Sequence, residues 1–244
     1  MFASLRRRAL VACLLAYCTL SFEVFAQVSA SDSALLESSL RTERDRQADA
    51  RRKPLELLKL AQVAPGMTVL DVASGGGYTA QILALAVGAQ GKVWAQIAKP
   101  SPALDARLAA QPQANLQVLA RPLEDLFSPE LPRVDRVTLI LSYHDIVNTS
   151  TDRGAMNKAI FNALKPGGFL IVMDHTGKPG SGVSETSTLH RIDQQAVVAE
   201  LTAAGFKFDG QSDAWKNPTD TLEQHSSKME MPSDRFALRF VRPQ

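Results

Sequence analysis

The feature that most constrains the fold is the stretch VLDVASGGGYTA at residues 69–80. VLDV predicts a short buried strand, the three glycines 75–77 predict a tight turn, and a helical segment begins at Tyr78. Strand, glycine-rich turn and helix in this order are typical of open sheets that bind a ligand where their strands end. Residues without a Cβ let the backbone approach a ligand, and N–H groups at a helix start favour electron-rich groups.

Strand-like and helix-like segments alternate along most of the chain. The predicted elements, in order, are helix 54–63, strand 67–72, helix 78–89, strand 92–98, helix 101–112, strand 115–120, strand 133–143, helix 151–164, strand 167–175, helix 193–205, strand 206–215 and strand 234–243. Such alternation predicts an α/β fold with a doubly wound, mostly parallel sheet and helices on both faces. The two closing strands predict an antiparallel addition, and the lack of a repeat or linker predicts one domain over 54–244.

The N-terminus has the pattern of an export signal. Arg6, Arg7 and Arg8 precede an apolar run that is too short to span a membrane comfortably. Val24 and Ala26 are small residues at the positions that a signal peptidase recognises. We predict a cleaved signal at 1–26, with a retained anchor as the alternative. The expected location is therefore the periplasm or the exterior, without membrane attachment after cleavage. Residues 27–53 predict a polar helical extension with a solvated charged face, in preference to a recognition patch.

Cysteine content and charge exclude several functions. Cys13 and Cys18 both lie in the predicted signal, so the mature chain has no disulfide, thiolate metal site or cysteine nucleophile. The formal charge of +2 falls to zero when Arg6, Arg7, Arg8 and Glu23 are removed, since these four carry a net +2. A neutral chain lacks the basic field of a nucleic-acid binder. The expected partner is a small molecule, and the oligomeric state is left open.

Two motifs give the chain a family resemblance. VLDVASGGGYTA resembles the first motif of class I S-adenosylmethionine-dependent methyltransferases, and ALKPGGFLIVMDH at 163–175 resembles their late motif. RKPLELL, GGGY, Tyr-His-Asp at 143–145, Asp-His at 174–175 and LHRID are together similar to a group of exported predicted methyltransferases. The resemblance covers roughly residues 41–242. It implies S-adenosylmethionine as cofactor and a seven-stranded sheet with an antiparallel last strand.

The resemblance also implies which residues bind the cofactor. Ala73 stands where the family has its first glycine, and it fits if its φ is negative. The second strand ends in Gln96 and Ile97 where the family has an acid, and the Gln96 amide is the available substitute. A dinucleotide site is disfavoured, because it requires Gly-x-Gly-x-x-Gly and that acid. The predicted cofactor-binding residues are Asp71, Ala73, Gly75, Gly76, Gly77, Tyr78, Gln96, Glu124 and Ser142.

Polar side chains follow the fourth and fifth predicted strands. Because the carboxyl ends of neighbouring parallel strands share one crevice, Asp71, Tyr143, His144, Asp145 and the pair Asp174 and His175 are expected around one mouth. His144 has the pKa range of a general base, and Asp145 or Asp174 could orient it. Tyr143 could shape the mouth or contact the sulfonium. We therefore predict Tyr143, His144 and Asp145 as catalytic residues.

A second group of candidates lies further along the chain. We assign His175, His190 and Arg191 to the substrate, with pinning of the 177–188 loop as the alternative for His190 and Arg191. A catalytic-type metal site from His144, His175, His190 and a carboxylate is a further alternative. The spacings of 31 and 15 residues match no compact metal motif, so no metal ligand is predicted.

These patterns favour one function over two others. The leading prediction is an exported enzyme that transfers a methyl group from S-adenosylmethionine to a small-molecule acceptor. Because that cofactor is made in the cytoplasm, a non-catalytic binding protein on the same scaffold is one alternative. A metal-assisted hydrolase or lyase that uses the histidines is the other.

Overall fold

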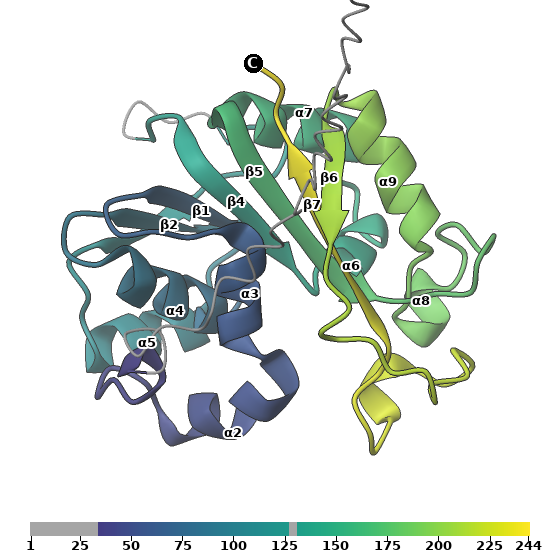
Figure 1. Cartoon of the computed structure of the whole chain (residues 1–244), viewed down its shortest axis with the longest axis horizontal. Coiled ribbons are helices and arrows are strands. Elements are labelled where there is room, and N and C mark those ends of the chain that lie inside the picture. Colours follow the sequence, from purple (N-terminus) through teal and green to yellow (C-terminus); the bar gives the residue numbers. More distant parts are fainter. Residues whose placement is uncertain (1–33, 127–130) are drawn as a thin grey trace, which may run out of the picture.

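The computed structural model describes residues 34–126 and 131–244, so the predicted signal at 1–26 lies outside the described residues. In the described part, one sheet has seven strands in the order β3-β2-β1-β4-β5-β7-β6 (Figure 1). The strands are β1 (Thr68–Val72), β2 (Lys92–Ile97), β3 (Leu116–Ala120), β4 (Val134–Ile140), β5 (Leu164–His175), β6 (Lys207–Gln211) and β7 (Arg235–Val241). The chain order reverses direction beside β1, as the glycine turn predicts for a ligand site.

The strand directions confirm the predicted fold class. β1 pairs in parallel with β2 and β4, β2 pairs in parallel with β3, and β4 pairs in parallel with β5. β7 runs antiparallel to both β5 and β6. The sheet is therefore mostly parallel with an antiparallel end, and the carboxyl ends of β1, β2, β4 and β5 lie along one edge.

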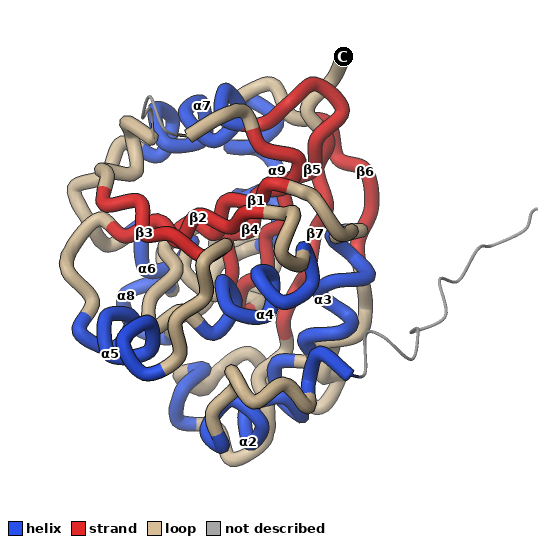
Figure 2. Tube along the Cα trace, turned by 90° about the vertical axis from the view of Figure 1, so that its left-hand side faces the viewer, coloured by secondary structure: helices blue, strands red, loops and turns tan. Residues whose placement is uncertain are grey.

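Helices cover both faces of the sheet (Figure 2). Ile82 of α4 and Leu104 of α5 belong to one apolar cluster with strand residues such as Val69. Ile160 of α7 and Leu201 of α9 belong to a second cluster on the other face. The described helices are α2 (Glu43–Arg52), α3 (Pro54–Ala61), α4 (Tyr78–Val87), α5 (Pro102–Ala110), α6 (Tyr143–Val147), α7 (Arg153–Ala163), α8 (Thr186–Leu189), α9 (Gln194–Ala203) and the 3₁₀ turn η1 (Ser226–Lys228). None of them combines the length and apolar character that a membrane crossing requires.

The fourth strand ends earlier than its sequence predicts. β4 stops at Ile140, Leu141 has a left-handed backbone with φ of 56°, and α6 begins at Tyr143. An L residue adopts this conformation at a cost of about 1–2 kcal/mol. The left-handed residue turns the chain sharply, so the residues after it follow a helical rather than an alternating pattern.

The N-terminal extension is not simply a solvated helix. Asp45 of α2 and Arg41 just before it are each only 3% exposed. A capping box at Thr42 and Asp45 starts α2, and Lys53, with φ of 46°, separates it from α3. In Figure 1, α2 lies beyond the carboxyl ends of the strands. Helix α2 therefore forms part of the wall around the edge of the sheet where the parallel strands end.

Candidate active site

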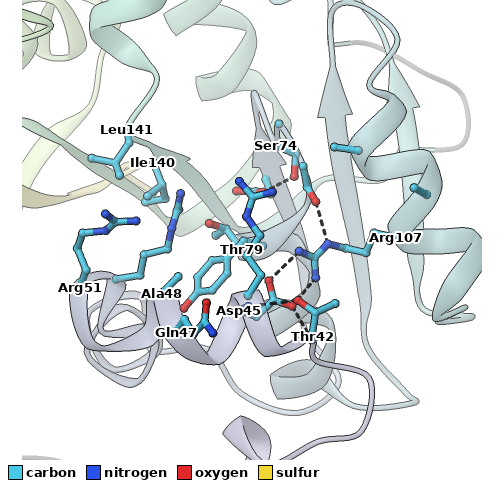
Figure 3. Close-up of a pocket in the computed structure, with 18 of the residues that line it drawn as sticks. Thr42, Asp45, Gln47, Ala48, Arg51, Ser74, Thr79, Arg107, Ile140 and Leu141 are labelled. Atoms are coloured by element: carbon cyan, nitrogen blue, oxygen red, sulfur yellow. Dashed lines mark hydrogen bonds and ion pairs between the residues drawn. The ribbon is translucent and has the colours of Figure 1, made fainter. Parts of the chain in front are cut away.

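A cavity of about 1050 Å³ lies at the carboxyl edge of the sheet (Figure 3). This volume is in the range of small-molecule and cofactor sites. Its wall combines the turn after β1, the end of β4, α2 and the first turns of α5. The lining residues used below are Asp45, Arg51, Arg52, Asp71, Ala73, Ser74, Gly75, Gly76, Tyr78, Arg107, Leu141 and Ser142.

The glycine turn has the close packing that its sequence predicts. Gly75 has φ of +56° and no heavy atom within 4 Å of the position of a Cβ, so it opens to the cavity. A Cβ on Gly77 would lie 2.6 Å from Leu104 Cδ1, so this glycine lets α4 pack against α5. Gly77 is not among the lining residues. Thus Gly75 and Gly76 are available to a ligand, and Gly77 holds the turn in place.

The expectation for Ala73 is wrong. Its φ is +52°, in the left-handed region where glycine is favoured. Its N–H donates to Gln96 Oε1 at 2.8 Å. The strained alanine is therefore held by a side chain from the neighbouring strand.

Gln96 and Ile97 both contact protein rather than the cavity. Gln96 is fully buried, and its Nε2 donates to the Arg121 carbonyl at 2.7 Å while its Oε1 accepts from Ala73. Its amide thus links the turns after β1 and β3. Ile97 packs against the apolar cluster of α4 and α5 and is absent from the cavity wall. Ile97 therefore does not project into the cavity.

Asp71 is the buried acid of the cavity. Thr138 Oγ1 donates to its Oδ1 at 2.6 Å, and Ser74 Oγ donates to its Oδ2. Burial raises the pKa of Asp71 to about 6, although the two hydroxyl donors oppose the shift. A cationic ligand group nearby would favour the ionised carboxylate.

A network of polar contacts fastens α2 over the glycine turn. Arg107 donates to both carboxylate oxygens of Asp45 at 2.8 Å and to the Gly76 carbonyl at 2.8 Å. Figure 3 shows Arg107 pointing at Asp45. Although burial opposes its charge, the bonds from Arg107 and Thr42 lower the pKa of Asp45 to about 2. The Tyr78 hydroxyl donates to Asp49 at 2.6 Å, so Tyr78 also anchors this wall.

Two arginines of α2 are site residues that the sequence did not reveal. Arg51 and Arg52 line the cavity, and in the described ranges neither forms an ion pair with a carboxylate. The Arg52 guanidinium lies 4.7 Å from the centre of the Tyr78 ring. Burial lowers the pKa of Arg52. These cations are available to an anionic ligand group such as a carboxylate.

The structure corrects the assignment of Tyr143. Its side chain is fully buried in the apolar cluster of α7 and α9, and it is absent from the cavity wall. Its hydroxyl donates to Glu200 at 2.7 Å and accepts from Asn157 Nδ2 at 2.7 Å. Tyr143 therefore stabilises the core, because the left-handed Leu141 turns this position inward. Ser142 does line the cavity.

His144 is bound tightly to a buried carboxylate. Its Nδ1 lies 2.6 Å from Asp174 Oδ1, and its backbone N–H donates to Asp174 Oδ2 at 2.9 Å. Burial disfavours the charged ring, but hydrogen bonds to Asp145 and Asp174 raise the pKa of His144 to about 9. The imidazole is therefore protonated at neutral pH in the free protein and is not ready to accept a proton.

Two other histidines, His190 and His175, lie near His144. His190 Nδ1 lies 3.1 Å from His144 Nε2, and Asp145 Oδ1 lies 3.3 Å from the same atom. His175 turns away, because its Nδ1 is bonded to Ser233 Oγ at 2.6 Å. Burial and Arg235 lower the pKa of His175 to about 2. His144, Asp145, Asp174 and His175 thus lie together as predicted, but none of them is among the residues that line the cavity beside Asp71.

Two further predicted site residues have structural contacts instead. Arg191 is fully buried, forms an ion pair with Asp220 at 2.9 Å and donates to two backbone carbonyls. These contacts hold Thr176 and the segment 220–224 and reach no residue of the 177–188 loop, so they do not bear out the alternative role left open for Arg191. Glu124 accepts from the Asp152 N–H at 3.2 Å and is absent from the cavity wall.

Comparison with known proteins agrees with this geometry. The protein-L-isoaspartate(D-aspartate) O-methyltransferase family matches residues 18–116. A S-adenosylmethionine-dependent methyltransferase from Aquifex aeolicus is 20% identical, with a TM-score of 0.60 over 86% of this chain and 97% of that one. The N-methyltransferase NodS from Bradyrhizobium japonicum is 14% identical, with a TM-score of 0.58 over 82% and 99%. The [4+2]-cyclase SpnF is 16% identical, with a TM-score of 0.62 over 85% and 86%.

The fold is therefore that of the class I methyltransferases. It confirms the fold class predicted from the sequence, and the family match at residues 18–116, which spans less than half of the chain, agrees with that fold. S-adenosylmethionine is the cofactor of this class, and the residues present fit it: a large cavity, an open glycine turn, a buried acid and two arginines without a carboxylate partner in the described ranges.

Proposed function

We propose that the protein transfers a methyl group from S-adenosylmethionine to a small-molecule acceptor. The observation that carries the proposal is the cavity itself, because Asp71, the open glycine turn and the end of β4 all line it. Asp71 would face the amino group of the cofactor, and Arg51 or Arg52 its carboxylate. Export of the protein stays a prediction that rests on residues 1–26.

The chemistry requires mainly alignment of two molecules. The cofactor supplies a methyl group on a positively charged sulfur. With the cofactor bound, a lone pair of the acceptor would form the bond to the methyl carbon as the carbon–sulfur bond breaks with its electron pair on sulfur, and any acceptor proton would pass to a base. Ser142 marks the acceptor side, because it lines the cavity and directly precedes the α6 residues His144 and Asp145.

Calorimetric titration of the full chain tests cofactor binding. We expect saturable 1:1 binding of S-adenosylmethionine and S-adenosylhomocysteine, and no binding of NAD. No heat with either sulfur compound up to about millimolar concentration would overturn the proposal.

Transfer is tested separately from binding. Methyl-labelled cofactor and the protein are incubated with a fractionated cell extract. Label in the small-molecule fraction supports the proposal. Label in the protein fraction would replace the acceptor class with a protein, as the name of the matched family suggests. Binding without transfer in any fraction would favour the non-catalytic alternative, since the fold alone does not fix the reaction.

A further inference from the structure

Three ligand atoms of the histidine group form a compact triangle. His144 Nε2 and His190 Nδ1 are 3.1 Å apart, His144 Nε2 and Asp145 Oδ1 are 3.3 Å apart, and His190 Nδ1 and Asp145 Oδ1 are 3.5 Å apart. A tetrahedral metal with bonds of 2.0–2.1 Å has ligand atoms about 3.3–3.4 Å apart. One cation therefore fits at bonding distance from all three atoms.

The contacts behind His144 are those of a metal ligand. Asp174, which is fully buried, accepts from His144 at Nδ1, so that Nε2 faces Asp145 and His190 and a metal would displace the proton on Nε2. Metal-ligating histidines usually donate their other ring nitrogen to such a carboxylate. The Asp174 carboxylate also accepts from the N–H groups of His144 and His175, which fixes its orientation.

His190, one of the three residues of the triangle, has a strained backbone conformation. His190 follows α8 with φ of 50°, a conformation that costs about 1–3 kcal/mol for such a residue. Strain of this kind collects at functional sites. The His190 ring also packs against the ring of His225, with ring centres 4.4 Å apart and ring planes tilted by 39°.

The triangle is buried on the side of His144 and exposed to solvent on the side of His190 and Asp145. The side chain of His144 is 3% exposed, whereas those of His190 and Asp145 are 39% and 56% exposed. Structural zinc sites have four protein ligands, whereas catalytic sites have three and an open position. Two imidazoles and a carboxylate suit first-row divalent metals such as zinc.

We propose that His144, Asp145 and His190 bind one divalent transition-metal cation whose open position takes a hydroxyl oxygen of the methyl acceptor. The choice of acceptor rests on the proposed function, whereas cation binding stands without it. The bound hydroxyl gives its proton to solvent water, and its oxygen forms the bond to the methyl carbon. As that bond forms, the carbon–sulfur bond breaks with its electron pair on sulfur. The triad differs from the alternative that the sequence offers, because it leaves out His175 and has Asp145 as its carboxylate.

Metal titration of the full chain tests the proposal. Protein freed of metal with a chelator is titrated with ZnCl₂, and with CoCl₂ for the visible absorption of a tetrahedral site. We expect one equivalent to bind. Asp145→Asn and His190→Ala should abolish that binding, and Asp174→Asn should weaken it about 10–100-fold. His175→Gln is the matched control and should bind like the wild type.

Each result of these metal titrations either supports or overturns the proposed metal site. Asp145 is exposed, so its variant retains the fold, which circular dichroism checks. Absence of stoichiometric binding, or binding that survives both Asp145→Asn and His190→Ala, overturns the proposal. Loss of binding in His175→Gln would replace the triad with the alternative one. Cofactor titration of the same metal-free protein separates the two proposals: cofactor binding without metal leaves methyl transfer standing alone, and metal binding without cofactor favours the hydrolase or lyase alternative.

Discussion

The N–H of Ala73, which directly follows β1, donates to the side-chain oxygen of Gln96 on the neighbouring strand β2 at 2.8 Å. The other end of the same amide donates to the Arg121 carbonyl. One buried side chain of β2 therefore holds the turns after β1 and β3, the strands on either side of it. Gln96 lies at the end of β2, where the family resemblance implies an acid. In this chain the Gln96 side chain instead fixes the position of Ala73, which lines the cavity.

Gln96→Met should destabilise the protein and weaken cofactor binding. The substitution keeps the volume but leaves the buried Ala73 N–H and Arg121 carbonyl without partners. Each unsatisfied group costs about 1–3 kcal/mol, so urea unfolding should show a loss of about 2–4 kcal/mol. Gln117→Met, at an exposed position of β3, is the control and should change stability little. Equal effects of the two changes would contradict the role of Gln96.

Ala73→Gly should stabilise the protein, unlike most alanine-to-glycine changes. Glycine removes the left-handed strain at φ of +52°, which is about 1–2 kcal/mol. It adds about 0.5–1 kcal/mol of backbone entropy to the unfolded chain. A net gain of about 0.5 kcal/mol is expected in urea unfolding. Ala109→Gly in α5 is the control and should cost about 1 kcal/mol; a similar loss at position 73 would refute the strain.

Arg52→Met should weaken the binding of S-adenosylmethionine without unfolding the protein. The Arg52 guanidinium lines the cavity and has no carboxylate partner among the described residues. A hydrogen bond to a charged group contributes about 1.5–3 kcal/mol, so calorimetry should show a Kd at least about 10-fold higher. Arg133→Met, at an exposed position outside the cavity, should leave the Kd unchanged. An unchanged Kd for Arg52→Met would exclude this contact.

The sequence predicts features that short segments determine. The order of helices and strands along the chain, the glycine turn and the cavity position of Asp71 follow from patterns within a few residues. Arg51 and Arg52 could not be found this way, because their place depends on packing between distant segments. Trp215 Nε1, for example, donates to the Arg52 carbonyl from 163 residues away.

The error about the direction of Tyr143 has a backbone cause. The prediction for Tyr143 assumed that the strand pattern continues, whereas the left-handed Leu141 starts a helix and turns Tyr143 into the core. The same helix, α6, carries Asp145 and places its Oδ1 at 3.3 Å from His144 Nε2. Backbone reversals at non-glycine residues have no local signal in a single sequence.

Asp71 should make stability depend on pH between about 4 and 6. Its pKa is about 6 in the folded protein, against the ordinary 3.8 of an aspartate carboxyl in an unfolded chain. Between these values the unfolded chain has lost the proton while the folded protein retains it. The stabilisation is therefore complete below about pH 4 and is lost as pH rises through 6, by about 3 kcal/mol.

Asp71→Asn isolates this effect, because asparagine does not titrate and the other acids are common to both proteins. In urea unfolding, the variant should gain about 3 kcal/mol relative to the wild type between pH 4 and pH 7. Parallel stability profiles would show that Asp71 is ionised throughout. Cofactor binding adds a second check, since a cationic amino group would favour the carboxylate and release a proton below pH 6. Calorimetry in buffers of different ionisation enthalpy should detect that proton in the wild type and not in Asp71→Asn.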